Sequence, residues 1–183
     1  MNNYPIYVSI LRGINVGGQR KILMADLKKL YENLGFKDVV TYIQSGNVIF
    51  KTTENYSSED LIQILETAIF EQYQFNVPII IRTKDEIDKT IDTNPFLSDK
   101  DVDLEKLHVT FLENTPNSTQ LEKIKAYDYS PDKFIIVDKN VYLYCPIDYG
   151  HSKLSNSFFE LKLKTKATTR NWKTVNKLSE LAT

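Results

Sequence analysis

Apolar residues alternate with other residues at the start of the chain, over residues 4–11, and this period of two predicts a first β-strand. Residues 27–34 carry leucine and tyrosine at helical spacing and precede Gly35, a residue typical of helix C-termini. The β-branched segments 39–43 and 48–50 then predict two strands joined by a short hairpin.

The pattern continues with a second helix and a fourth strand. Serines at residues 57–58 can cap a helical apolar stripe over residues 62–73, and residues 77–81 predict a strand. A Thr-x-x-Glu sequence at residues 83–86 resembles the capping box of a further short helix. Residues 4–83 therefore have the order βαββαβ, which is the split βαβ or ferredoxin-like arrangement.

Much of this order recurs in the second half of the chain. The elements expected there are a strand at Leu107–Leu112, a helix at Thr119–Ala126, a hairpin at Phe134–Tyr144, a helix with Leu154, Phe158 and Leu161, and a helix from near Thr169 that replaces the final strand and buries Trp172. The predicted fold class is therefore α+β, with two ferredoxin-like (split βαβ) lobes in tandem and a C-terminal helix. The expected division is lobe 1 at residues 1–92, an acidic linker at residues 93–106, and lobe 2 at residues 107–183.

The most unusual segment is LRGINVGG at Leu11–Gly18, where the first strand runs into a glycine-rich loop flanked by Arg12 and Arg20. In the split βαβ topology, the end of the first strand and the hairpin at Gln44–Asn47 lie at the same edge of the sheet. The first helix also begins there, with its positive dipole end. Two polar loops beside a helix N-terminus form a candidate anion pocket; the alternative is that the glycines only permit tight turns.

The ligand hypothesis names an anionic or phosphorylated small molecule, with a nucleotide or sugar phosphate as examples. Arg12 and Arg170 would supply charge, and the loop backbone and short polar side chains would supply hydrogen bonds. The candidate ligand-binding residues are Arg12, Gly13, Asn15, Gly17, Gly18, Ser45, Gly46, Asn47, Arg170 and Asn171.

Other chemistry has weaker support. The spacing Gly13-x-x-x-x-Gly18 lacks the Lys-Ser/Thr of a P-loop, and the dinucleotide-binding glycine pattern is absent. Tyr7 on the first strand resembles a base-stacking position, but we expect the second lobe to cover it. His151 is a weak general-base candidate, and no metal-ligand spacing occurs. No catalytic residue, cofactor or oligomeric state is therefore assigned, and whether the protein is an enzyme stays open.

Charge and composition define two alternatives. The composition is that of a globular domain, and the single cysteine, Cys145, fits a reducing cytoplasm, with no apolar run of membrane-spanning length or signal peptide. Residues 151–183 carry seven Lys/Arg and two acidic residues, a net charge of +5. This basic surface, with Lys164, Lys166 and Lys173, is the basis of a nucleic-acid-binding alternative. The other alternative is a structural or regulatory protein without a ligand.

Three segments together resemble a known bacterial family, domain of unknown function 1697. They are LRGINVGG at Leu11–Gly18, TYIQSGNVIF at Thr41–Phe50 and TTRNWKTVNKL at Thr168–Leu178. The resemblance spans nearly the whole chain and implies tandem ferredoxin-like lobes, in agreement with the strand order above. It implies no biochemical activity. The family motif positions include Trp172 in addition to the candidate ligand-binding residues.

Overall fold

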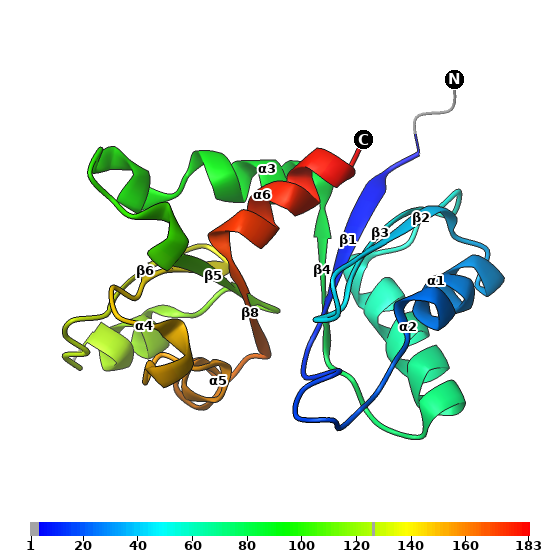
Figure 1. The fold of residues 1–183 in the computed structure, drawn as a ribbon, viewed down its shortest axis with the longest axis horizontal. Coiled ribbons are helices and arrows are strands. Elements are labelled where there is room, and N and C mark those ends of the chain that lie inside the picture. Colours follow the sequence, from blue (N-terminus) through cyan, green and yellow to red (C-terminus); the bar gives the residue numbers. More distant parts are fainter. Residues whose placement is uncertain (1–3, 126) are drawn as a thin grey trace. The chain divides into compact units, whose positions relative to one another are not determined.

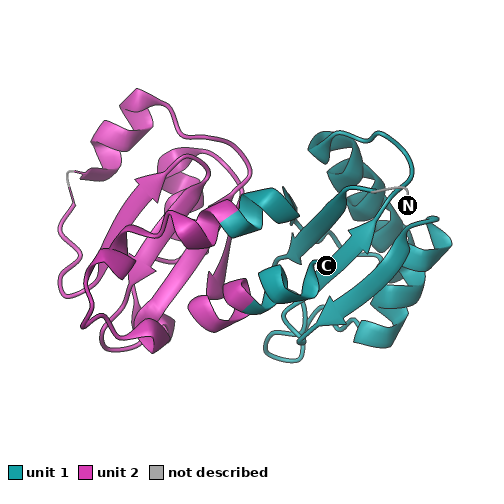
Figure 2. Ribbon diagram, turned by 90° about the horizontal axis from the view of Figure 1, so that it is seen from above, with its two compact units in different colours: residues 1–88, 177–183 teal, residues 89–176 magenta. Residues whose placement is uncertain are grey.

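The computed structural model describes residues 4–125 and 127–183. The chain divides into two compact units, unit 1 with residues 1–88 and 177–183 and unit 2 with residues 89–176 (Figure 2). Unit 1 therefore contains segments from both ends of the chain. Along the chain, helix α3 (Lys84–Asp92) leads from unit 1 into unit 2, and helix α6 (Trp172–Leu181) leads back.

Unit 1 has the predicted ferredoxin-like order (Figure 1). Its sheet runs β2-β3-β1-β4, and every neighbouring pair is antiparallel. Helices α1 and α2 cover one face of this sheet. Strands β1 and β2 point in the same direction, because each of them is antiparallel to β3. The elements up to the end of the sheet are β1 (Ile6–Leu11), α1 (Met24–Asn33), β2 (Lys37–Tyr42), β3 (Asn47–Lys51), α2 (Ser58–Tyr73) and β4 (Ile79–Thr83).

The predicted capping residues of α2 and α3 are confirmed. Ser57 and Asp60 form a reciprocal capping box at the start of α2. Thr83 and Glu86 do the same for α3, since Thr83 N–H donates to Glu86 Oε2 at 2.9 Å and Glu86 N–H donates to Thr83 Oγ1 at 3.2 Å. Each box satisfies two N–H groups that a helix start otherwise leaves unpaired.

The expectation that the second lobe covers Tyr7 is wrong. Tyr7 is buried in the core of unit 1, its ring stacks on Phe50 with centroids 5.8 Å apart, and its hydroxyl donates to the carbonyl of Tyr56 at 3.4 Å. Strand positions with odd numbers in β1 face α1 and α2, so Ser9 lies in the same layer and its hydroxyl contacts that of Tyr31 at 2.8 Å.

Unit 2 repeats the arrangement with the sheet order β6-β7-β5-β8. Its elements are η1 (Pro95–Ser98), η2 (Leu104–Lys106), β5 (Leu107–Leu112), α4 (Ser118–Lys125), β6 (Lys133–Val137), β7 (Asn140–Tyr144), η3 (Tyr149–His151), α5 (Asn156–Leu163) and β8 (Ala167–Asn171). The core beneath α4 and α5 includes Ile124, Leu143 and Phe159. Ala126, the last residue of the predicted helix, lies outside the described residues.

Two expectations about the second half are wrong. The final strand is not replaced by a helix, because β8 pairs with β5 over five positions, His108–Leu112 with Asn171–Ala167, and α6 starts only at Trp172. Leu154 precedes α5, and Leu161 is largely exposed, since the buried positions of that helix are Phe159 and Leu163. Trp172 is buried, as expected.

Candidate functional site

The glycine-rich loop is a small protruding hairpin, Asn15–Arg20, which we call the glycine hairpin. Its closing hydrogen bonds run from Gln19 N–H to the carbonyl of Val16 at 3.0 Å and from Asn15 N–H to that of Arg20 at 3.2 Å. Gly17 and Gly18 form the turn with φ of 58° and 76°, the two left-handed residues that a type I′ turn requires. Nothing lies within 4 Å of a Cβ built on either residue, so backbone conformation alone requires these glycines.

The side chain of Asn15 joins this hairpin to the second loop. Its Nδ2 donates to the carbonyls of Gln44 and Ile22, both at 2.9 Å, and its Oδ1 accepts from Ile22 N–H at 2.9 Å. The two loops are also joined by Leu11 N–H, which donates to the carbonyl of Gly46 at 2.9 Å. The prediction that the two loops meet at one edge of the sheet is confirmed, and the Asn15 amide is used to hold them together.

Gly46 and Asn47 have structural roles in the second loop. A Cβ on Gly46 would lie 2.6 Å from Ile14 Cδ1 and 2.9 Å from Leu11 Cβ, and φ is 80°. Asn47 is fully buried, and its Nδ2 donates to the carbonyl of Tyr42 at 3.0 Å and to Ser45 Oγ at 3.3 Å. Close packing therefore requires Gly46, and Asn47 shapes the hairpin from inside.

Positive charge gathers at the end of the sheet where these two loops meet, which we call the loop edge. Arg12 is half-buried, whereas Arg20 and Lys21 are exposed. The Arg20 guanidinium lies over Gly13, because a Cβ built on Gly13 would be 3.4 Å from Nη1. Neither residues 4–25 nor residues 43–47 contain an Asp or Glu. The two loops therefore contribute three cations and no carboxylate, and the nearby carboxylate of Glu66 accepts a hydrogen bond from Ile79 N–H at 3.1 Å. An excess of positive charge favours anions.

Several residues at this edge also have strained backbones. Asn15, Arg20 and Ile43 adopt left-handed φ values of 56°, 47° and 50°. Asparagine adopts this conformation more readily than most residues, but it is unusual for arginine and especially for β-branched Ile43, a residue that is 45% exposed. Strain of this kind is concentrated at functional sites in proteins.

The two remaining candidate residues, Arg170 and Asn171, belong to unit 2. Arg170 lies on β8 opposite Val109, and its Nη1 donates to the carbonyl of Thr169 at 2.9 Å. Burial of the guanidinium lowers the pKa of Arg170 to about 10. Asn171 caps α6, because its Oδ1 accepts from Thr174 N–H at 2.8 Å. Arg170 was expected in the first turn of a helix that begins near Thr169; it is instead a strand residue.

Arg82 occupies the equivalent position in unit 1, and the sequence reasoning missed it. It lies on β4 opposite Val8, as Arg170 lies on β8 opposite Val109, and its Nη1 donates to the carbonyl of Ile81 at 2.9 Å. Burial lowers the pKa of Arg82 to about 10, an effect that the nearby Glu86 opposes. The signal was a shared pattern, since in both units an arginine near the end of the fourth strand directly precedes a capped helix.

Three further reactive side chains, Cys145, His108 and His151, belong to unit 2. Cys145 is buried, and desolvation raises its pKa to about 11. His151 is exposed and contacts Asp148 at 2.8 Å. His108 stacks on Tyr149 with centroids 4.6 Å apart, and burial lowers its pKa. Among residues 4–125 and 127–183, no cluster of three or more His, Cys, Asp or Glu side chains could hold a metal ion.

Three lysines of the basic C-terminal segment make local contacts. Lys166 pairs with Glu113 at 3.1 Å, and Lys177 pairs with Glu180 at 2.8 Å. Lys162 Nζ lies 4.1 Å from the centre of the Tyr127 ring. Lys164 and Lys173, the other two lysines of the nucleic-acid alternative, are exposed, so that alternative stays a prediction. In the described part of the chain, no helix is both long and apolar enough to cross a bilayer.

The fold and the loop edge define the protein as a tandem ferredoxin-like α+β protein with an exposed basic hairpin. The chain belongs to the family described as Protein of unknown function (DUF1697), which matches residues 5–142. It is similar in fold to the structure of the conserved bacterial protein SP0830 from Streptococcus pneumoniae, with a TM-score of 0.78 and 22% sequence identity. The similarity covers 98% of this chain and 99% of that chain. No match was found among curated proteins.

Proposed function

We propose that the protein binds a phosphorylated or otherwise anionic small molecule at the loop edge of unit 1. The observation that carries this proposal is the presence of three cations on the loop between β1 and α1, which Asn15 joins to the hairpin at residues 44–47. Arg20 and Lys21 are exposed at this edge, and Arg12 is half-buried beside them.

Backbone donors add to this charge. No hydrogen bond within the described residues takes up the N–H of Gly17 or Gly18, and both residues are exposed. A phosphate oxygen can accept hydrogen bonds from such N–H groups as well as from guanidinium. Asn15 and Asn47 position the loops and Gly13 lies beneath Arg20, so Arg12, Arg20, Lys21 and Ser45 are the side chains we assign to the ligand.

The test is calorimetric titration of the whole protein with inorganic phosphate, a nucleoside monophosphate and a hexose phosphate. We expect at least one of these probes to bind and the double variant Arg20→Gln, Lys21→Gln to bind it at least tenfold more weakly. The reason is that a hydrogen bond to a charged group contributes roughly 1.5–3 kcal/mol.

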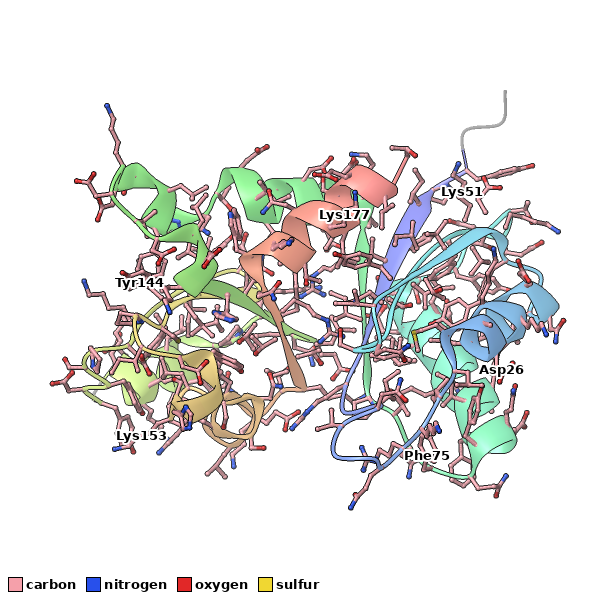
Figure 3. The ribbon with its side chains drawn as sticks, viewed as in Figure 1. Asp26, Lys51, Phe75, Tyr144, Lys153 and Lys177 are labelled. Carbon is pink, nitrogen blue, oxygen red and sulfur yellow. The ribbon has the colours of Figure 1, made fainter. Side chains whose placement is uncertain are left out.

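Lys37→Gln is the matched control. Lys37 is an exposed lysine of unit 1 that pairs with Lys51 at the opposite edge of the sheet, as the label of Lys51 in Figure 3 shows. Its loss removes the same type of charge without touching the loops, so affinity should be unchanged. The proposal fails if no probe binds, or if Lys37→Gln and the double variant bind equally.

A further inference from the structure

The edge strands of the two sheets occupy equivalent positions but differ in how well their outer sides are protected from pairing with another strand. Strand β2 is an edge strand of the sheet of unit 1, and β6 is the corresponding edge strand of the sheet of unit 2. Val40 of β2 pairs with Ile49, and Ile135 of β6 pairs with Tyr142, at matching positions of the two sheets. Their exposed fractions are nearly equal, 39% for Val40 and 40% for Ile135.

Strand β2 carries features that hinder pairing with another strand. Its register with β3 shifts between Lys37 and Val40, and Asp38 within this bulge has φ of 51°. The Asp38 carboxylate also forms an ion pair with Lys51 at 3.0 Å. A bulge and charged side chains are the usual protection of an exposed sheet edge.

Strand β6 has no bulge, and its one charged residue, Lys133, lies at its first position. All five of its residues, Lys133–Val137, pair with β7 in an unbroken register, and the last four are Phe-Ile-Ile-Val. A regular apolar edge strand is a template for another strand. No strand of the described residues occupies its outer side.

The register shows which backbone groups point outward. Leu112 N–H donates to the carbonyl of Lys139, and Cys145 N–H donates to that of Lys106, so Lys139 and Cys145 face β5. The backbone N–H and C=O groups of successive residues in an antiparallel strand point to opposite sides. The backbone groups of Tyr142 therefore point toward β6, where they form hydrogen bonds with those of Ile135. The N–H and C=O groups of the residues on either side of Ile135 therefore point away from the sheet.

We infer that a second copy of this chain pairs with β6, antiparallel, across a two-fold axis at Ile135. Phe134 of each copy then lies opposite Ile136 of the other copy, and their outward N–H and C=O groups form four hydrogen bonds. Both residues already pack against the core beneath α4 and α5, so this arrangement extends the same apolar layer. The two exposed Ile135 side chains meet and leave water, which stabilises the pair.

A lysine of one copy approaches an aspartate of the other copy at each end of the strand in this arrangement. The exposed Lys133 of each copy lies opposite Val137 of the second copy, next to Asp138 in the turn. Asp138 also pairs with Lys89 of its own copy at 3.1 Å, and Asp132 lies opposite Asp138 of the second copy. The strand is thus self-complementary in its apolar pattern, as a two-fold contact requires.

Cysteine cross-linking tests this pairing directly. Residues that face each other without mutual hydrogen bonds are about 4.5 Å apart at Cα, which is within the range of a disulfide. We expect Ile135→Cys to form a covalent dimer on treatment with diamide, and the matched control Val40→Cys to stay monomeric on a non-reducing gel. The buried thiol of Cys145, whose pKa is about 11, gives no background.

Sedimentation equilibrium of the unmodified chain provides a second measurement. We expect a concentration-dependent dimer, a dissociation constant at least tenfold higher for Ile135→Lys, and no change for Val40→Lys, with thermal melts showing that both variants fold. A chain that is monomeric at every concentration overturns the inference and leaves the edge to a strand of a different protein. Equal cross-linking of the two cysteine variants, or a dimer unaffected by Ile135→Lys, also overturns it.

Discussion

At the residue scale, Gly18 and Gly46 have nearly the same backbone φ, but glycine is required at the two positions for different reasons. Gly18 has φ of 76° and open space around its Cβ position, whereas Gly46 has φ of 80° and two apolar neighbours within 3 Å of it. The sequence showed both as parts of glycine-containing loops and could not separate these reasons. The difference depends on side chains, Ile14 and Leu11, that only the folded chain brings against Gly46.

This contrast predicts different costs of alanine at the two positions. Gly18→Ala should lower the free energy of unfolding by roughly 1–2 kcal/mol, the cost of a left-handed residue with a Cβ. Gly46→Ala should cost roughly 1–3 kcal/mol more, because Ile14 and Leu11 must also move. Urea denaturation of both variants measures the difference, and equal losses would contradict the steric argument.

At the element scale, local signals predicted the helices and the sheet of unit 1 correctly. The capping boxes at Ser57 and Thr83 and the β-branched residues at every second position of β1 depend on neighbouring residues, so they are visible without a structure. Strand β8 was missed because Ala-Thr-Thr-Arg-Asn lacks the apolar alternation of a strand. Thr168 and Arg170 of this strand are buried, and tertiary contacts such as the 2.7 Å hydrogen bond between the Thr110 and Thr169 hydroxyls satisfy its polar groups.

The connection between the two loops of unit 1 leads to a further prediction. In Asn15→Gly the left-handed backbone is still allowed, but the bonds to Gln44 and Ile22 are lost. We expect the Ile22 amide to exchange with solvent at least tenfold faster, since it loses its only acceptor among the described groups. Hydrogen–deuterium exchange measures this rate, with amides of α2 as internal controls. Unchanged protection at Ile22 would mean that other contacts hold the loop edge.

At the scale of the whole molecule, the division of the chain could not be predicted from the linear order of elements. A boundary was expected in an acidic linker at residues 93–106, but part of that segment packs on unit 2, with the Phe96 ring 6.1 Å from that of Tyr144. The last seven residues are grouped with unit 1, at the other end of the sequence. Such a return depends on contacts between distant segments, which periodicity does not report.

One contact of this kind lies within unit 1 and is sensitive to pH. The Asp88 carboxylate accepts a hydrogen bond from Ser179 Oγ at 2.6 Å and also pairs with Lys84. The hydrogen bonds from Lys84 and Ser179 lower the pKa of Asp88 below its ordinary value. A carboxylate with a lowered pKa stabilises the fold above its unfolded pKa of about 3.9, and the contribution disappears as pH falls through the folded value.

Asp88→Asn should therefore lower the melting temperature by about 1–3 °C at pH 7, a modest shift because solvent screens a partly exposed pair. The difference from the unmodified protein should shrink as pH falls below about 4. Asp85→Asn is the matched control, since it removes a carboxylate from the first turn of the same helix. Thermal melts between pH 3 and pH 7 measure both variants. If Asp88→Asn and Asp85→Asn gave the same shift at every pH, the return of the C-terminal segment to unit 1 would not depend on this carboxylate.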